Sequence, residues 1–167
     1  MTMWRAGKLV AVAALLLAGT AAAAPPKAGV LVPGRSLGGV SLGMTQAQVR
    51  DAWGSRFGVC RDCRGRTTWY FNREPFQPQG AGVELRRGRV VAAFTLWKPP
   101  GWRTSDGLAL GESEARITEV YGALTRIECG GYSALTMRNG GAVTVFYVFE
   151  GALWGFGLTR PNVPTCR

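Results

Sequence analysis

Apolar residues recur at helical spacing in two short stretches of the sequence. The first stretch places four apolar side chains on one helical face: Val49, Ala52, Trp53 and Phe57. The second stretch places a similar set on one face: Ile117, Val120, Tyr121 and Leu124. Each stretch therefore predicts a short helix that buries this face.

Both predicted helices carry start and stop signals. Thr45 is a good N-cap for the first helix, and Gln48 three residues later completes a capping box. Ser113 occupies the corresponding position before the second helix. Gly54 and Gly122 follow the helices at the position where a left-handed residue commonly ends a helix.

Strand-like segments rich in β-branched and aromatic residues follow each predicted helix. After the first helix they are residues 67–72, 82–86 and 89–97, and after the second they are residues 133–138, 142–150 and 152–159. Gly residues between neighbouring segments, at Gly88, Gly140 and Gly151, predict hairpin turns. The pattern indicates a unit of one short helix followed by about three antiparallel strands, used twice.

The two helical stretches align without a gap, since residues 39–54 match residues 107–122 at a constant offset of 68 positions. We therefore expect an α+β fold made of two tandem copies of a short helix followed by an antiparallel β-meander. The copies span residues 36–97 and 104–167, and a Pro/Gly linker at 98–103 joins them. Trp53 and Tyr121 are expected to be equivalent buried rings.

This pattern resembles two known families. In both copies, a turn such as Leu-Gly-Met-Thr leads into a capped helix that ends in an aromatic residue and a glycine, at residues 42–54 and 110–122. A β-meander then follows the helix. It is similar to the SmpA/OmlA family of small exported lipoproteins and to the β-lactamase-inhibitory-protein fold, in which two such units lie in tandem. The resemblance implies a concave sheet surface that binds a partner. The sequence has no lipid-anchor cysteine after the cleavage site, which departs from the SmpA/OmlA pattern.

The N-terminus has the layout of a secretory signal peptide. Arg5 and Lys8 precede an apolar stretch from Leu9 to Thr20, and small alanines follow. We expect cleavage after Ala23, which gives a signal peptide at residues 1–23 and a flexible leader at 24–35. A membrane anchor is the alternative, but the apolar run is shorter than the roughly 20 residues of a span. The mature chain is expected to be secreted or in the cell envelope, with no stable membrane anchor.

Four cysteines in an exported chain predict two disulfides. Two connectivities fit the sequence: Cys60–Cys63 with Cys129–Cys166, or Cys60–Cys129 with Cys63–Cys166. We prefer the first, because matching positions in tandem copies are usually far apart. A redox-active Cys60-Arg61-Asp62-Cys63 motif and a zinc site are alternatives, but the motif follows a helix instead of preceding one.

The charge distribution is one-sided. The sequence has 20 basic and 10 acidic residues. Residues 36–103 hold eleven basic and four acidic residues, which is a net charge of +7, whereas residues 104–167 hold five and six, which is −1. Such a field favours anionic partners. Export argues against nucleic acid, so an anionic cell-envelope polymer is the partner that this feature predicts.

The sequence offers no recognisable catalytic constellation. It contains no histidine, which removes the usual general base and the commonest metal ligand. The carboxylates are scattered, so we expect no enzyme activity, no cofactor and no metal. The predicted function is an exported binding module, protein-binding or inhibitor-like, that uses its sheet face; the alternative is a basic module associated with anionic envelope polymer.

Aromatic residues of the strands are the candidates for partner binding, although most of them are needed for the core. Alternation along a strand puts Trp69 on one face and Tyr70 on the other. The candidate binding residues are Trp69, Tyr70, Trp97, Tyr147 and Trp154, with Arg64 and Arg66 beside them.

Overall fold

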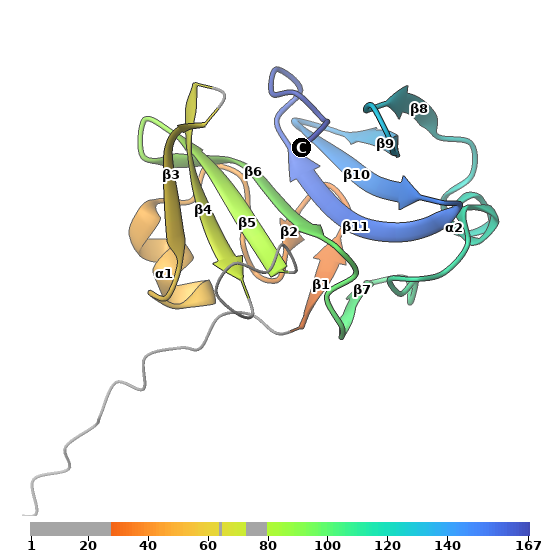
Figure 1. Cartoon of the computed structure of the whole chain (residues 1–167), viewed down its shortest axis with the longest axis horizontal. Helices are drawn as coiled ribbons and strands as arrows, with labels where there is room; N and C mark the ends of the chain where they lie inside the picture. Colours follow the sequence, from red (N-terminus) through yellow and green to blue (C-terminus); the bar gives the residue numbers. More distant parts are fainter. Residues whose placement is uncertain (1–27, 64, 73–79) are drawn as a thin grey trace, which may run out of the picture.

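The computed structural model describes residues 28–63, 65–72 and 80–167 (Figure 1). The predicted signal peptide 1–23, the first part of the leader and Arg64 lie outside the described residues. None of the helices in the described ranges is long and apolar enough to span a membrane.

The described residues form two helices and two sheets. The helices are α1 (Gln46–Trp53) and α2 (Glu114–Tyr121). A small sheet has the order β2-β1-β7, with β1 (Gly29–Val32), β2 (Ser36–Leu37) and β7 (Trp102–Thr104). A large sheet has the order β3-β4-β5-β6-β11-β10-β9-β8, with β3 (Gly58–Cys63), β4 (Arg66–Asn72), β5 (Gly80–Arg86), β6 (Arg89–Leu96), β8 (Thr125–Glu128), β9 (Ser133–Asn139), β10 (Ala142–Phe149) and β11 (Ala152–Thr159).

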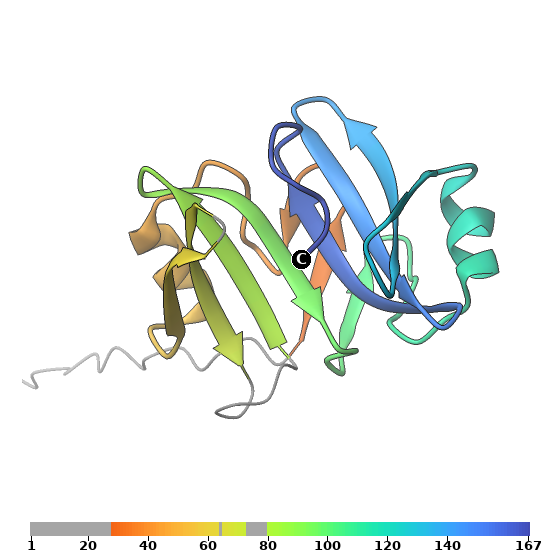
Figure 2. The same cartoon turned by 45° about the horizontal axis from the view of Figure 1, so that its top comes forward.

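The prediction of an α+β protein made of two tandem helix-plus-meander copies was wrong. Among the described residues, 51% are in strands and 12% in helices, and the main element is one large antiparallel sheet of eight strands. The reason is the pairing of β6 with β11, which joins all eight strands into one sheet. In Figure 2, β6 and β11 lie side by side in the middle of this sheet, and α1 and α2 lie at opposite ends of the molecule.

The seam between β6 and β11 is short and tightly fitted. Its register pairs are Gly157–Phe94, Leu158–Ala93 and Thr159–Ala92. Next to them, the Thr95 hydroxyl accepts a hydrogen bond from the Phe156 amide at 3.0 Å. Gly155 comes so close to β6 that a Cβ at this position would lie 2.1 Å from the carbonyl oxygen of Thr95. The sequence therefore needs glycine at this point of the seam.

Both helices begin and end as the sequence predicts. Thr45 and Gln48 form a capping box at the start of α1, and Ser113 caps α2. Gly54 and Gly122 follow the two helices with positive φ values of 83° and 76°, which glycine adopts without strain. These local signals explain why two isolated short helices form at these positions.

The main core lies between the large sheet and the layer formed by the helices and the small sheet. Trp53 lies at its centre: its side chain is 1% exposed, and its indole nitrogen donates a hydrogen bond to the carbonyl oxygen of Gly38 at 2.8 Å. The ring meets Trp102 of β7 edge to face. Residues 29–32, which the sequence analysis placed in a flexible leader, thus form β1, and residues 102–103, which it placed in the linker, belong to β7.

Tyr121 is not equivalent to Trp53. It is only half-buried, it stacks on Phe146 with ring centroids 4.8 Å apart, and its hydroxyl donates a hydrogen bond to Asp106 at 2.9 Å. The expectation that both rings are fully buried is therefore wrong for Tyr121. The helical pattern cannot show this difference, because both rings end an apolar helical face and their burial depends on the surrounding tertiary structure.

Candidate functional site

The two faces of the large sheet have different surroundings. One face packs against the helices and the small sheet, and it carries Phe71, Val83, Phe146 and Phe156. The residues that alternate with these point to the opposite face, which we call the second face. It carries a separate cluster of buried apolar side chains, to which Phe94, Tyr147 and Trp154 belong.

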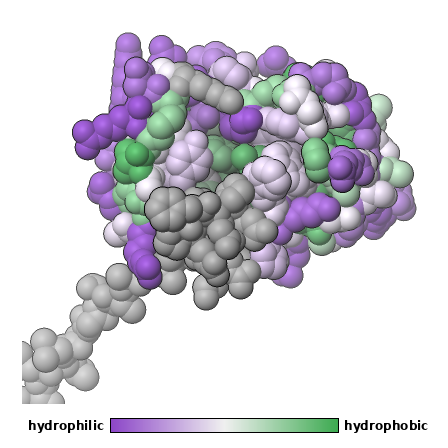
Figure 3. All heavy atoms as spheres, viewed as in Figure 1, coloured by the Kyte–Doolittle hydropathy of each residue, from purple (hydrophilic) through white to green (hydrophobic). Residues whose placement is uncertain are grey.

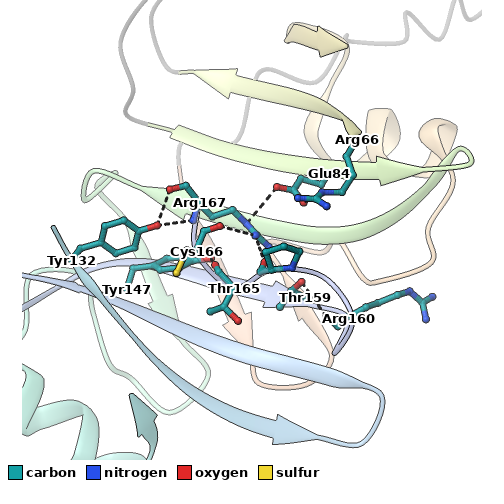
Figure 4. Close-up of polar contacts among 10 residues, drawn as sticks. Arg66, Glu84, Tyr132, Tyr147, Thr159, Arg160, Thr165, Cys166 and Arg167 are labelled. Carbon is teal, nitrogen blue, oxygen red and sulfur yellow. Dashed lines mark hydrogen bonds and ion pairs between the residues drawn. The ribbon is translucent and has the colours of Figure 1, made fainter. Parts of the chain in front are cut away.

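Residues 160–167 cross the second face and are fixed there at several points (Figure 4). We call them the C-terminal segment. The amide of Arg160 donates a hydrogen bond to Val91 at 3.0 Å, and Val163 packs with Val91 in a small apolar cluster. The hydroxyl of Tyr147 donates to the carbonyl oxygen of Thr165 at 3.0 Å. A disulfide joins Cys166 to Cys129, so this segment is part of the folded sheet surface.

Arg167 ends this segment inside the second face. Its side chain is 3% exposed, and its guanidinium carbon lies 5.5 Å from the ring centroid of Phe94. The Tyr132 hydroxyl donates to the Arg167 carbonyl oxygen at 2.7 Å. The Arg167 guanidinium also pairs with Glu84, at 3.7 Å, and Glu84 pairs with Arg66, at 2.7 Å. Figure 4 shows these side chains converging from β4, β5 and the C-terminal segment.

Aromatic rings gather beside this segment. We call the following six residues the aromatic patch: Tyr70, Phe94, Trp97, Tyr132, Phe149 and Trp154. Trp154, which is 8% exposed, lies at the centre, and its ring contacts those of Trp97, Tyr132 and Phe149 at centroid distances of 5.2, 5.2 and 6.1 Å. Tyr70 contacts Phe94 at 6.3 Å. Figure 3 shows pale and green side chains around a hollow in the middle of the molecule and purple, hydrophilic ones toward its rim.

Three rings of the aromatic patch are exposed to solvent. Trp97 is 47% exposed, and Tyr70 and Phe149 are each 38% exposed. Single exposed apolar residues are normal, but here Trp97 and Phe149 both contact the buried Trp154, and Tyr70 contacts Phe94 of the same apolar cluster. Such a surface, rich in Trp and Tyr, has the composition of protein-binding hot spots.

Trp97 is held in a backbone conformation that bulky residues rarely adopt. Its φ is 65°, and that of the next residue, Lys98, is 48°. The Lys98 amide donates a hydrogen bond to the carbonyl oxygen of Trp154 at 2.9 Å, which fixes this turn against β11. Left-handed conformations of non-glycine residues carry strain and cluster at binding sites. An exposed tryptophan is thus held in a strained backbone conformation.

The structure separates the predicted binding residues into three groups. Tyr70, Trp97 and Trp154 belong to the aromatic patch. Trp69 is 4% exposed and stacks on Phe57 in the main core, at 4.1 Å between ring centroids, so it cannot present its ring to a partner. Tyr147 is fully buried beneath the C-terminal segment.

The structure describes only one of the two arginines that the sequence analysis named as candidate binding residues. Arg66 is partly buried and paired with Glu84, whereas Arg64 lies outside the described residues. The sequence analysis missed Phe149, Tyr132, Glu84 and Arg167 as part of this surface. Strand alternation could have placed Glu84 opposite to Val83 and Leu85, but the position of the C-terminal segment has no signal in the sequence pattern.

Glycines on the second face allow two rings to lie close to the strands. A Cβ on Gly82 would lie 2.5 Å from the ring of Phe94, and one on Gly157 would lie 2.8 Å from the Tyr147 hydroxyl. On β11, Gly157 is therefore covered by Tyr147 of the neighbouring strand β10. This packing buries Tyr147 and leaves the aromatic patch as the exposed part of the surface.

A groove of about 470 Å³ lies between the C-terminal segment and the far end of the sheet. Its walls come from β8, β9, β10 and the segment, and they include Thr125, Ile127, Thr136, Val143, Val163 and Thr165. The lining combines hydroxyls with apolar side chains and contains one arginine, Arg138.

The disulfides are Cys60–Cys63 and Cys129–Cys166, which is the connectivity that the sequence analysis preferred. The first bridges two residues of β3 in an exposed hairpin, away from any helix N-terminus. Within the described parts of the chain, no three His, Cys, Asp or Glu side chains gather in a way that could hold a metal ion. Two disulfides fit an oxidising compartment.

One tyrosine has a shifted pKa. Burial raises the pKa of Tyr121 to about 12, and its hydrogen bond to Asp106 adds to this increase. Tyr121 is the last residue of α2 and does not lie on the second face. Its shift therefore reflects packing at the helix and does not mark a catalytic group on the candidate surface.

Comparison with known proteins adds information on the fold alone. No protein-family model matches the chain, and no curated protein matches its sequence. The fold is similar to the 1.5 Å crystal structure of an extracellular protein containing a SCP domain from Bacillus anthracis, with a TM-score of 0.53 and 14% identity. The similar region covers 72% of this chain and 44% of that one, so this chain matches less than half of that protein. The resemblance to the SmpA/OmlA and β-lactamase-inhibitory-protein families stays a prediction.

Proposed function

We propose that this protein is an exported, non-catalytic binding module that binds another exported protein through the aromatic patch. The observation that carries the proposal is Trp97, a 47% exposed tryptophan held in a left-handed backbone conformation against Trp154. An exposed ring that is already fixed loses little conformational entropy on binding. It can therefore act as an anchor for a partner surface.

Several further features support export and binding. The predicted signal peptide, the two disulfides and the extracellular protein of similar fold favour an extracytoplasmic location, secreted or in the cell envelope. The rings of Tyr70 and Phe149 extend the patch on both sides of Trp154 and Phe94.

The test is capture of exported proteins from the native host by the mature chain and its variants. The double variant Trp97→Ala/Phe149→Ala removes two exposed rings, and Val59→Ala, which is 49% exposed on β3, serves as the matched control. We expect a partner that binds the parent and Val59→Ala and loses roughly tenfold or more in affinity for the double variant. If parent and double variant bind the same proteins equally well, the patch is not the binding surface.

Association with an anionic envelope polymer is the second candidate, and one observation favours it. Arg89 and Arg160 both approach Gly43, and Arg87 is exposed on the turn between β5 and β6. None of the three forms an ion pair with an acid among the described residues. Binding through these arginines should weaken steeply as salt is raised, whereas binding through an apolar patch should not. A salt series on the captured partner separates the two candidates.

A further inference from the structure

The groove between the C-terminal segment and the far end of the sheet has a volume of about 470 Å³ and lies on the second face. Ala134 of β9 belongs to the buried cluster of that face, and Thr136 and Arg138 follow it at every second position, so all three lie on one side of the strand. Val143 of β10, which pairs with Arg138, belongs to the same cluster. The C-terminal segment forms another wall, through Pro161, Val163 and Thr165.

The two ends of this groove differ. Val143 pairs with Arg138 of β9 and with Thr159 of β11, the strand that leads into the C-terminal segment. Arg138 therefore lies at the end where this segment begins. At the other end, the disulfide Cys129–Cys166 joins the segment to the residue that follows β8. The groove thus runs along the segment from an exposed arginine to a covalent bridge.

Arg138 gives the groove a positive charge that no neighbouring acid neutralises. Among the described residues of the lining it is the one charged side chain, and it forms no ion pair with a described acid. Glu128 of β8 alternates with Ile127 of the groove, so it lies on the opposite side of β8, where it pairs with Arg126. A single unpaired cation favours a ligand with a single negative charge.

A carboxylate meets this requirement better than a phosphate group does. It carries one negative charge at neutral pH, and its two oxygens match the planar fork of a guanidinium. A phosphate monoester carries about two negative charges at the same pH. The charge of Arg138 is therefore balanced by one carboxylate.

The remaining lining combines aliphatic and hydroxyl side chains. Ile127 is 37% exposed and Val143 and Val163 are each 7% exposed, so they offer a branched aliphatic surface to a ligand. The Thr136 hydroxyl donates its proton to the carbonyl oxygen of Thr125 at 3.2 Å, so toward the groove it can only accept a hydrogen bond. An N–H group of the ligand satisfies this acceptor, whereas a hydrocarbon chain leaves it unpaired.

We infer that the groove binds the carboxyl end of a peptide whose last residue has an aliphatic side chain. The terminal carboxylate pairs with Arg138, the aliphatic side chain packs on Val143 and Val163, and a peptide N–H donates to Thr136. The volume lies in the range of about 300–1,000 Å³ that is typical of small-ligand sites. The groove shares no residue with the aromatic patch, so this inference does not rest on the proposed protein-binding function.

The first experiment titrates the peptide acetyl-Ala-Ala-Leu into the isotope-labelled mature chain and follows it by NMR. We expect saturable shifts at the methyl groups of Ile127, Val143 and Val163 and none at Val59, which lies on β3. Two analogues each remove one feature of the ligand. The amide of the same peptide lacks the negative charge, and acetyl-Ala-Ala-Gly lacks the aliphatic side chain. Each analogue should bind roughly tenfold more weakly than acetyl-Ala-Ala-Leu.

Variants of the protein test the same two contacts from the other side. Arg138→Gln should make the peptide and its amide bind equally, and Arg103→Gln, an exposed arginine of β7, is the matched control that should keep the difference. Thr125→Phe places a ring in the groove at an exposed position, so it should abolish binding of all three peptides. Val59→Phe adds a ring outside the groove and should leave binding unchanged.

Equal binding of the peptide and its amide by the parent protein would overturn the inference. Absence of shifts at the groove methyl groups, or shifts confined to the aromatic patch, would do the same. These comparisons use the parent protein alone, so they decide the matter even if Arg138→Gln or Thr125→Phe fails to fold.

A free peptide and the C-terminus of a partner protein offer the same chemistry, and competition distinguishes them. If acetyl-Ala-Ala-Leu and Thr125→Phe both weaken capture of an exported partner, the C-terminus of that partner occupies the groove. If the peptide fills the groove and capture is unchanged, the ligand is a free peptide. If the peptide binds and no partner is captured, the proposed protein-binding function fails and the groove site stands.

Discussion

The indole ring of Trp53 meets the phenyl ring of Phe71 edge to face, with ring centroids 5.2 Å apart and an angle of 85° between the planes. This contact joins α1 to β4 of the large sheet. Because both rings are buried, the contact fixes how the helix lies on the sheet.

Replacing Trp53 with Ala should lower the free energy of unfolding by about 3–5 kcal/mol, the range for loss of a large buried aromatic side chain. Tyr121→Ala should have a smaller effect, because Tyr121 is only half-buried. Urea unfolding of both variants measures the difference. An equal loss in the two variants would contradict the distinction between the two rings.

The stability should depend on pH through Tyr121. Its native pKa of about 12 lies above the ordinary value of 10.0, so the native state holds the phenol proton more tightly than the unfolded state. The contribution of Tyr121 is therefore complete below about pH 10 and is lost as the pH rises toward about 12. In a titration followed by the absorbance of tyrosinate, one late-titrating tyrosine should disappear in Tyr121→Phe. Asp106→Asn should move that titration to lower pH.

The two disulfides should contribute unequally. Cys129–Cys166 closes a sequence separation of 37 residues and Cys60–Cys63 one of three. In the chain-entropy model, their loss costs about 4 and about 2 kcal/mol. Paired Cys→Ser variants, compared by denaturant unfolding, test this order. Hydrogen exchange at residues 163–167 should increase in Cys129→Ser/Cys166→Ser alone, because that disulfide holds the C-terminal segment on the second face.

Gly155→Ala should destabilise the seam between β6 and β11. The new Cβ would lie 2.1 Å from a backbone oxygen of β6, so one strand has to move. We expect a loss of about 1–3 kcal/mol, typical of overpacking. Gly58→Ala on β3 is the control, because a Cβ there meets nothing within 4 Å. Equal stability of the two variants would show that the seam can widen without cost.

The sequence predicted the parts of the fold that depend on neighbouring residues. Thr45, Ser113 and the glycines after each helix are local signals, and both helices lie where these signals put them. Most strands buried on both sides were also found, because their apolar and β-branched residues form continuous runs. β3 and β8 were missed, since edge strands with mostly exposed side chains have no apolar pattern.

The pairing of β6 with β11 could not be predicted, because it joins residues about sixty positions apart and no local preference encodes it. That one contact overturned the expected fold class. The candidate site was found in part for the same reason. Alternation along strands indicated that Tyr70 and Trp69 face opposite ways, but which face stays exposed depends on the C-terminal segment, whose course is fixed by Cys129–Cys166 and by Tyr132 and Tyr147.

The ends of the large sheet bear on how this protein resists aggregation. An exposed edge strand offers unpaired backbone groups to a second chain, and long flat edges recruit further strands. Here β8 is only four residues long and carries Arg126 and Glu128, and β3 is interrupted by a register shift between Cys60 and Cys63. The disulfide within β3 keeps that irregularity in place. Neither edge therefore offers a long, regular template for strand addition by other copies.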